Sequence, residues 1–502
     1  MDQPSCVIRA FAHFVDVVRE CCGAGTAWTA PRQVKYLQSY LETNDDEEKR
    51  PKTLVIERPY VDRHYLEEYT TYYATSLRPP NPHASRIHVF SSDFDQAGWE
   101  EQLVQAAGGD LLTVQRELNQ SYLGFITIRP LPNTPVGRTL LRTYGGAKGR
   151  KYQPVIQACS ARILGIELKF DALPFVQQDQ GVGACASVAL WASLAKVARA
   201  TGMRAPTPFA VTQAATKNWV TDRVVPAAGG LELGQLANAV REFGFAPYTV
   251  KVNDHPQMFL WTLKVYLNSG VPAILLLGIG QEMHAITVAG YREGTSSIEI
   301  GEAPRVHRFG SLARIYAHDD RIGPYSKMSL SETEKQEWKR LEVVRPAVDD
   351  PSDVDLTKDS NVTYAIYPLY PKLRLSASDL ATLAGGLGPL FNQLLGKDLA
   401  NAITTEGSFL LNGEYLKDLY SLGGDGKRIA QMVQHTRLSR YVGLLRWFLN
   451  GEILADVVCD TTDIYRETEP YGAVLAVLLF DSRYVEPAKK MAKDLVEEDR
   501  FY

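Results

Sequence analysis

A chain of 502 residues is too long to be organised around one hydrophobic core. Domains usually contain about 100–200 residues, so the length predicts about two to four of them. Hydrophobic residues make up 45% and charged residues 22% of the chain, which is an ordinary globular mixture. The sequence therefore predicts several folded domains, and local motifs have to show which of them carries a function.

The charge pattern offers no basis for binding nucleic acid. The formal net charge is −4, from 54 basic and 58 acidic residues. The densest basic cluster, at 148–151, is typical of a short solvated turn. Proteins that bind nucleic acid need a clustered basic surface to contact phosphates. We therefore expect no nucleic acid as a partner.

Targeting signals and cysteines predict a cytoplasmic protein that does not enter a membrane. The first residues, MDQPSC, do not combine a basic segment with an apolar core, as a signal peptide would. The longest apolar run, Val271–Ile279, is much shorter than the roughly 20 residues that cross a bilayer. Six cysteines stand at 6, 21, 22, 159, 185 and 459, without a Cys-x-x-Cys pair or the spacing of a zinc site. Such free thiols are typical of a reducing compartment.

Residue composition and the pattern of apolar residues along the chain divide it into four parts. We expect an N-terminal α/β region at 1–168, a central α+β domain at 169–330, a Pro- and Asp-rich linker at 331–360, and a C-terminal mixed α/β region at 361–502. The expected helices are 7–18, 65–75, 96–118 with a break at its two glycines, 184–200, 208–218, 231–243, 261–268, 377–395 and 489–498. The expected strands are 53–57, 86–90, 122–129, 272–277, 285–291, 297–300 and 363–367.

The segment QQDQGVGACASVALW, at 177–191, places a cysteine where a Gly-containing turn becomes a long apolar helix. The start of a helix carries unpaired N–H groups and a partial positive charge. Both stabilise a thiolate, and the same N–H groups can stabilise an oxyanion on an attacked carbonyl. Cys185 is therefore a candidate nucleophile, although a lone cysteine is more often a small buried residue.

A histidine follows in the segment GQEMHAITVAGY, at 280–291, where a polar turn becomes an apolar strand. His284 can exchange protons near neutral pH and could face a thiol on a helix. Asp319 and Asp320 come at the end of the next strand-like segment. A carboxylate that accepts a hydrogen bond from the imidazole Nδ1–H would fix the orientation of the ring. Because successive strand residues point to opposite faces, we expect only one of the two aspartates to do so.

The ordered set of a glutamine, a cysteine on a helix, a histidine on a strand and an aspartate resembles the papain-like cysteine peptidases. It is most similar to their compact bacterial members, including the peptidases that process bacteriocin leader peptides. The helix-like segment 230–244 and the Gly-x-Pro unit before the apolar strand, at 267–276, resemble the same family. The resemblance covers about residues 170–330. It implies a papain-like central domain, with the nucleophile helix packed on an antiparallel sheet.

The resemblance also implies a role for each residue. Cys185 would attack the acyl carbon, His284 would transfer the proton, and Asp319 or Asp320 would orient the imidazole. Papain-like enzymes carry an oxyanion-stabilising glutamine six residues before the cysteine, where this chain has Asp179. We favour Gln178 for that role, with Gln180 as the alternative, because the following turn could absorb one extra residue. The aromatic residue that follows the nucleophile in the family is replaced here by alanine.

Several activities remain open on this set of residues. A thioester at Cys185 that is resolved by water gives a peptidase or a deamidase, and one resolved by an amine gives a transglutaminase or acyltransferase. We favour a cysteine peptidase by analogy with the family. A non-catalytic papain-like binding module is the alternative of a different class, since the flanking regions are large enough to recognise a protein partner. His307 and His318 lack the spacing of metal ligands, so we expect no metal and no cofactor; His318 could instead bond within the site.

Overall fold

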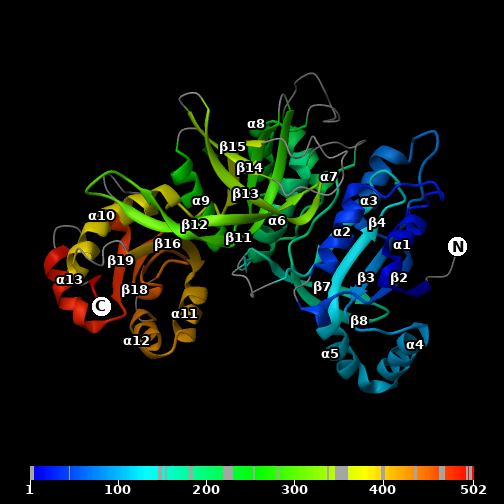
Figure 1. Cartoon of the computed structure of the whole chain (residues 1–502), viewed down its shortest axis with the longest axis horizontal. Coiled ribbons are helices and arrows are strands. Elements are labelled where there is room, and N and C mark those ends of the chain that lie inside the picture. The colour runs from blue at the N-terminus through cyan, green and yellow to red at the C-terminus, as the bar shows by residue number, and fades with distance from the viewer. Residues whose placement is uncertain are drawn as a thin grey trace. The chain divides into compact units, whose positions relative to one another are not determined.

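The computed structural model describes most of the chain (Figure 1). The described residues are 5–43, 46–144, 150–152, 155–179, 185–218, 230–252, 255–279, 282–335, 338–344, 360–396, 402–434, 438–462, 470–492, 496 and 500–502. The chain is a mixed α+β protein with four antiparallel sheets, which confirms the general fold class. Among the described helices, none is both long and apolar enough to cross a bilayer. Most of the predicted linker lies outside the described residues.

The chain forms two compact units. The first unit contains residues 1–243, 274–290 and 316–328, and the second contains 244–273, 291–315 and 329–502. Three long strands, β11 (Glu282–Ile300), β12 (His307–Asp319) and β13 (Gly323–Lys335), continue from one unit into the other. The sequence predicted two separate strands within the range of β11, where the structure has one. The predicted division into four parts remains a prediction.

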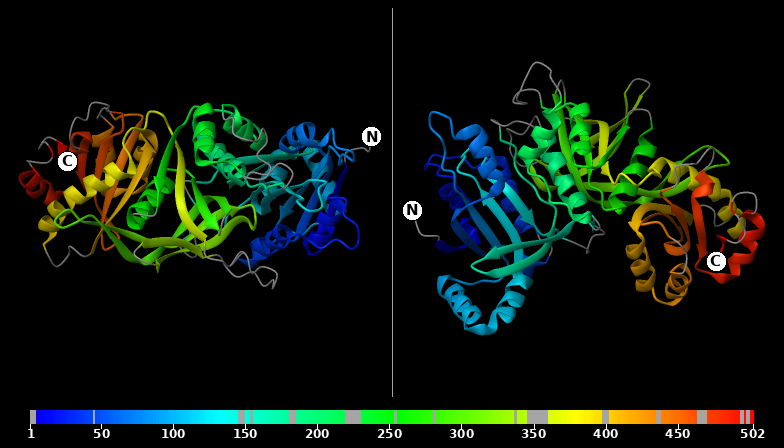
Figure 2. Two further views of the ribbon diagram at one scale, coloured as in Figure 1. Left: turned by 90° about the horizontal axis from the view of Figure 1, so that it is seen from above. Right: turned by 180° about the vertical axis from the view of Figure 1, so that it is seen from behind.

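The N-terminal part of the first unit is built on an antiparallel sheet, seen from two further sides in Figure 2. Its strands follow chain order: β1 (Ser5–Ala10), β2 (Thr53–Tyr60), β3 (Ala84–Phe90), β4 (Tyr122–Ile128) and β5 (Val136–Leu141). Five helices accompany them: α1 (Phe14–Cys21), α2 (Arg32–Glu42), α3 (Arg63–Glu68), α4 (Gln96–Gln105) and α5 (Leu111–Ser121). The expected α/β region therefore has an antiparallel sheet, as in α+β proteins, because its strands pair with their chain neighbours.

Local sequence explains most of these elements and one error. All seven residues of β3 and of β4 are buried. Burial is expected for the mostly apolar β4, which is covered on both faces, whereas β3 also buries the polar side chains of Arg86 and His88. The predicted helix at 96–118 is broken at Gly109, whose φ of 109° is readily adopted only by glycine. The predicted helix at 7–18 is wrong at its start, where β1 pairs with β2. A short apolar run does not distinguish a strand from a helix until a pairing partner is known.

A hairpin of β7 (Gln157–Ile163) and β8 (Ile166–Ala172) packs against this part of the unit. Its residues alternate between buried and exposed, the pattern of a sheet with one solvated face. Leu164 and Gly165 connect the strands, and both have positive φ, as type I′ hairpin turns require. The buried face of the hairpin joins a core with Trp99 of α4 and Leu118 of α5.

The described remainder of the first unit contains three helices and five strand segments, the shortest of which is β6 (Arg150–Lys151), paired with β11. The helices are α6 (Cys185–Ala200), α7 (Pro208–Thr216) and α8 (Leu233–Glu242), close to the predicted ranges. Gly202 and Gly244 follow α6 and α8 with positive φ, the conformation that commonly ends a helix. Strand β10 (Ala273–Ile279) lies next to β11, which is followed by β12 and β13. These are the segments that carry the candidate residues.

The second unit contains the other halves of the long strands and a separate C-terminal sheet. The long strands are accompanied there by four further elements, β14 (Trp338–Val344), β15 (Ser360–Leu369), β9 (Ala246–Lys251) and α9 (Pro256–Asn268). The C-terminal sheet has the order β16 (Ile403–Leu411), β17 (Tyr441–Leu449), β18 (Glu452–Asp460), β19 (Val474–Leu479). Helices α11 (Asn412–Ser421) and α12 (Gly424–Val433) pack on one face of it. Helix α10 (Ala377–Leu395) contacts β16 and β17, and α13 (Val485–Ala492) follows near the C-terminus.

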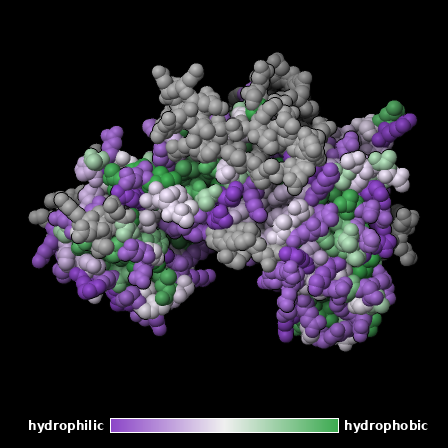
Figure 3. Space-filling view, viewed as in Figure 1, coloured by the Kyte–Doolittle hydropathy of each residue, from purple (hydrophilic) through white to green (hydrophobic). Residues whose placement is uncertain are grey.

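Apolar side chains outside the cores are dispersed. The most exposed large ones are Leu77, Leu112 and Val104, at 97%, 75% and 73% exposure. Hydrophilic and apolar residues are interspersed over the coloured part of the face shown in Figure 3. Single exposed apolar residues are normal on protein surfaces and need no functional explanation. The search for a site therefore rests on buried polar groups.

Candidate active site

The first part of the candidate site is the start of helix α6, which carries Cys185. The helix begins at Cys185, as the sequence predicted, and the Cys185 side chain is half-buried. The N–H groups of the first helical turn have no partner within the helix, and they create a partial positive charge next to the sulfur. Residues 180–184, which include Gln180 and the two turn glycines, lie outside the described residues. The structure therefore places the thiol where a helix stabilises negative charge.

A buried hydrogen bond holds α6 against the strand that carries the histidine. The Thr287 hydroxyl of β11 donates to the Ala189 carbonyl of α6 over 2.7 Å. Ala189 lies one helical turn after Cys185, and Thr287 lies three residues after His284. Ala192 of α6 and Ala285 of β11 line the same small cavity as Ala189 and Thr287. Small side chains allow close approach, so the bond sets how the thiol is positioned relative to the imidazole.

The imidazole lies against both candidate aspartates. Nε2 of His284 is 2.8 Å from Oδ1 of Asp319 and 3.5 Å from Oδ1 of Asp320, and all three residues are buried. Only Asp319 hydrogen-bonds to the imidazole, as expected, but the Asp320 carboxylate is not turned away from the ring as strand alternation predicted. Asp319 is the last residue of β12 and Asp320 belongs to the following turn, so the alternation of a strand does not extend to it.

The nitrogen that contacts the carboxylates also differs from the expectation. The sequence argument assigned Nδ1 to the aspartate, but Nε2 of His284 makes this contact. Nδ1 is buried and makes no hydrogen bond within the described part of the chain. Cys185 makes the smallest of the named contributions to the raised pKa of His284, so its thiol lies near the ring. Nδ1 is therefore the nitrogen that remains for the sulfur, and the imidazole lies between a thiol and a carboxylate.

Charge explains the protonation of the histidine. Burial alone would lower the pKa of His284, but the charge and hydrogen bond of Asp319, followed by Asp320, outweigh it and raise the pKa to about 10. Burial raises the pKa of Asp320 to about 6, and the charge of Asp319 adds to this rise while His284 opposes it. At neutral pH the imidazole is therefore held as a cation, the form that stabilises a neighbouring thiolate.

Small cavities lie beside the thiol. One is lined by Cys185, His318, Asp320 and six smaller or apolar residues, and its volume of about 10 Å³ is enough for one water molecule. His318 does not bond to the other site residues as proposed above. Its Nε2 lies 3.1 Å from the Leu173 carbonyl, and its Nδ1 accepts from the Tyr325 N–H over 3.2 Å. Burial lowers the pKa of His318 to about 3, so it is a neutral structural residue.

The predicted oxyanion residue lies close to this cavity. Gln178 is half-buried and lines a second cavity together with Ser187 and Val188, and Val188 also lines the cavity of Cys185. Asp179, at the position of the family's glutamine, is buried in the wall of the second cavity. The structure therefore brings Gln178 to the neighbourhood of the thiol, and its role as an oxyanion donor stays a prediction. The alternative, Gln180, lies outside the described residues.

Sequence reasoning missed a carboxylate in the second cavity. Glu68 of α3 lines it, and burial raises the pKa of this carboxyl to about 7. The Arg129 guanidinium, 3.3 Å from Glu68, opposes the rise, and Asp179 adds to it. Glu68 precedes Gln178 by 110 residues and belongs to no motif, so the sequence carried no signal for this proximity.

The same imidazole and carboxylates have the donor atoms of a cation site. One atom from each of His284, Asp319 and Asp320 lies within 4.8 Å of the others, the only such group found among the described residues. His307 and His318 are not part of it. A cation at Nε2 would have to displace the 2.8 Å hydrogen bond that Nε2–H donates to Asp319 Oδ1. The arrangement is therefore better described as a hydrogen-bonded triad, and a chelator can test the alternative.

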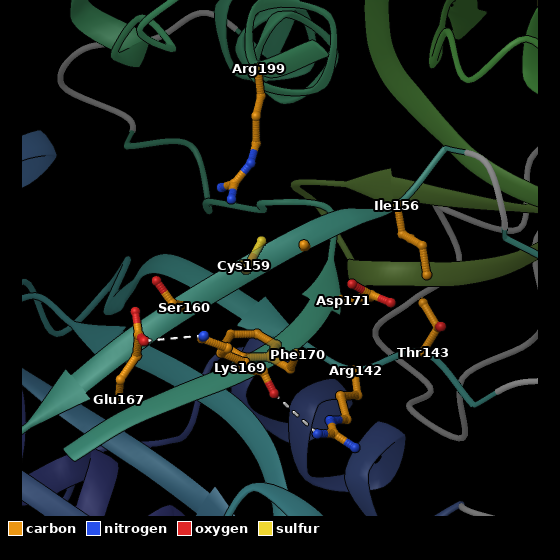
Figure 4. Close-up of a pocket in the computed structure, with 11 residues that line it drawn as sticks. Arg142, Thr143, Ile156, Cys159, Ser160, Glu167, Lys169, Phe170, Asp171 and Arg199 are labelled. Carbon is orange, nitrogen blue, oxygen red and sulfur yellow. Dashed lines mark hydrogen bonds and ion pairs between the residues drawn. The ribbon is translucent and has the colours of Figure 1, made fainter. Parts of the chain in front are cut away.

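A larger groove lies over the exposed face of the β7–β8 hairpin and has a volume of about 730 Å³. Figure 4 shows Arg199 entering it from the last turn of α6, with Lys169 and Arg142 on the opposite side. Glu167 pairs with Lys169 over 3.3 Å, and Asp171 also lines the groove. Its charges are mixed, and neither Cys185 nor His284 lines it. This groove is therefore separate from the candidate triad.

Comparison with known proteins does not identify the chain. No protein-family model matches it, and no curated protein is significantly similar to it in sequence.

Proposed function

We propose that this chain is a papain-like thiol hydrolase that cleaves proteins or peptides with a triad of Cys185, His284 and Asp319. One observation carries the proposal. A buried imidazole uses Nε2 to contact Asp319 and leaves Nδ1 for a cysteine at the start of a helix. Nucleophilic catalysis by cysteine needs this order of nucleophile, base and orienting group.

Each group has one task in the proposed reaction. At neutral pH His284 is already a cation, so Cys185 attacks the acyl carbon as the thiolate of an ion pair with the imidazolium. N–H groups at the start of α6 stabilise the negative charge that forms on the acyl oxygen. The imidazolium then donates its proton to the leaving amine, and a thioester remains. Water attacks the thioester, the now neutral His284 takes a proton from that water, and the acid product leaves as the thiolate–imidazolium pair is restored.

The choice of peptide-bond hydrolysis follows the resemblance to papain-like peptidases. Transfer to an amine, deamidation and a non-catalytic binding role would use the same fold. The group that accepts the acyl chain distinguishes hydrolysis from transfer, and the reactivity of Cys185 distinguishes an enzyme from a binding module. A cation-dependent reaction is distinguished by a chelator, because a triad of this kind needs no metal.

The first test is alkylation of the purified protein with iodoacetamide over a range of pH, followed by peptide mass spectrometry. We expect selective labelling of Cys185 near pH ~6, where an ordinary thiol is almost entirely protonated. The other five cysteines serve as internal controls, and burial raises the pKa of two of them, Cys6 and Cys159, to about 11. Treatment with EDTA should leave the labelling unchanged.

The second test is a search for cleaved peptides in a proteome-derived library, with Cys185→Ala as the matched control. We expect cleavage by the wild-type protein and none by the variant. Cleavage that persists in Cys185→Ala would contradict the mechanism. If Cys185 labels no faster than Cys6, the binding-module alternative is favoured instead.

A further inference from the structure

We propose that helix α2 of the N-terminal region positions the aspartates of the triad, with Gln33 and Tyr36 as the positioning residues. That α2 contributes to catalysis rests on the proposed function. The N-terminal region would then be part of the catalytic machinery. This assigns a role to a segment that stands about 280 residues before the aspartates in the sequence and shares no motif with them.

Two hydrogen bonds connect α2 to the turn between β12 and β13. Gln33 donates from Nε2 to the Asp320 carbonyl over 2.9 Å, and the Tyr36 hydroxyl donates to the Pro324 carbonyl over 3.0 Å. The two acceptors are four residues apart and bracket the turn. The helix therefore holds the turn at both of its ends.

The turn between β12 and β13 packs tightly against α2. A side chain at Gly323 would overlap the ring of Tyr36, so the backbone of the turn lies directly on that ring. Within the turn, Asp319 Oδ1 accepts from the Arg321 N–H over 3.0 Å, and the Asp319 carbonyl accepts from the Ile322 N–H over 2.9 Å. A movement of the turn would therefore carry the Asp319 carboxylate with it.

The helix itself is anchored along the same face. Gln33, Tyr36 and Tyr40 are spaced by three and four residues, which places them on one side of α2. The Tyr40 hydroxyl donates to the Arg142 carbonyl over 2.9 Å, and the Tyr40 ring stacks on Tyr325 of β13 at 5.8 Å. One face of α2 thus contacts the turn that carries the aspartates and the strand that follows it.

The position of the turn matters because the carboxylates act over short distances. The contacts of Asp319 and Asp320 with His284 are 2.8 and 3.5 Å, so a shift of about 1 Å would weaken both. Burial raises the pKa of Tyr36, a hydrogen bond with Ser326 opposes that rise, and the nearby charge of Asp319 adds to it. Loss of the α2 contacts should therefore change the protonation of His284 and, through it, the reactivity of Cys185.

The test measures the second-order rate of Cys185 alkylation as a function of pH in the full-length chain. We expect Gln33→Ala and Tyr36→Phe each to lower the rate near pH 6 by about tenfold or more, and to move the pH profile toward that of an isolated thiol. Gln38→Ala is the matched control, since Gln38 lies on the same helix and donates to Glu42 within it. Thermal unfolding shows which variants remain folded.

The outcomes separate this inference from the proposed function. If Gln33→Ala and Tyr36→Phe give the rates and pH profile of Gln38→Ala while His284→Ala lowers the rate, α2 does not position the triad and the thiol mechanism stands. If His284→Ala also leaves the rate unchanged, the proposed function fails by itself. Should Gln33→Ala prove unfolded, Tyr36→Phe decides the question, because it removes one hydroxyl and keeps the ring that lies on Gly323.

Discussion

Two buried histidines in the first unit contact carboxylates, and they end in opposite protonation states. His88 of β3 lies 2.9 Å from Glu57 through Nε2 and 2.7 Å from the Tyr122 hydroxyl through Nδ1, yet burial lowers its pKa to about 4. His284 has a similar Nε2–carboxylate distance, and its pKa is raised to about 10. A buried histidine–carboxylate pair is therefore not, by itself, evidence of a catalytic site.

The neighbouring charges explain the difference. Arg86 forms an ion pair with Glu57, so the carboxylate is already neutralised, and the charge of Arg86 further disfavours a proton on His88. His284 has two carboxylates beside it instead. The second ring nitrogen differs as well, since that of His88 contacts a phenol and that of His284 is left for a thiol. The first cluster is a satisfied core network, and the second holds a protonated imidazole at the candidate active site.

The comparison predicts its largest effect for removal of each imidazole. His284→Ala should lower the rate of Cys185 alkylation near pH 6 by more than about 100-fold, because the thiolate loses its cationic partner. His88→Ala should leave that rate unchanged and lower the free energy of unfolding by about 3 kcal/mol, because Glu57 and Tyr122 lose a buried partner. Mass spectrometry and urea unfolding measure the two effects. Equal loss of thiol reactivity in both variants would break the comparison.

A smaller effect is expected for Asp320 and depends on pH. Burial raises the pKa of this carboxyl in the folded protein to about 6, above its ordinary value of 3.8, so the folded state favours the protonated form. The resulting stability is fully present below pH 3.8 and is lost as the pH rises through about 6. Relative to Asp320→Asn, the wild-type protein should lose about 3 kcal/mol of unfolding free energy across this window. Denaturant unfolding at pH 4 and pH 7 tests this, and a parallel pH dependence in both proteins would contradict it.

The smallest effect concerns the cation of the core network. Arg86→Met removes the charge that opposes protonation of His88, so its pKa should rise from about 4 toward the ordinary value of 6.5. An NMR titration of the histidine side chains measures the shift. The labelling of Cys185 serves as the control and should not change. If the pKa of His88 stays low without Arg86, burial alone explains it, and neighbouring charge is not what distinguishes the two histidines.

The sequence by itself determined the elements that bear the candidate residues. A Gly-containing turn before an apolar segment placed Cys185 at a helix start, and an apolar run after a polar turn placed His284 on a strand. The positions of α6, α8 and α10 followed from periodicity and from glycines after the first two, since these signals act within a few residues. Strand β1, the first strand of the chain, was missed because a short apolar run forms a strand only where another strand pairs with it.

Only the tertiary structure decided how these residues act together. It brought both aspartates to Nε2 of His284, because the turn after β12 ends the alternation on which the sequence argument relied. It also placed Glu68 beside Gln178 and α2 beside the turn of the aspartates. Contacts between segments that stand 100 to nearly 290 residues apart leave no local pattern, and the charges that set a buried pKa are known only when the neighbours are. The sequence therefore predicted the candidate residues, and the fold decided their geometry and protonation.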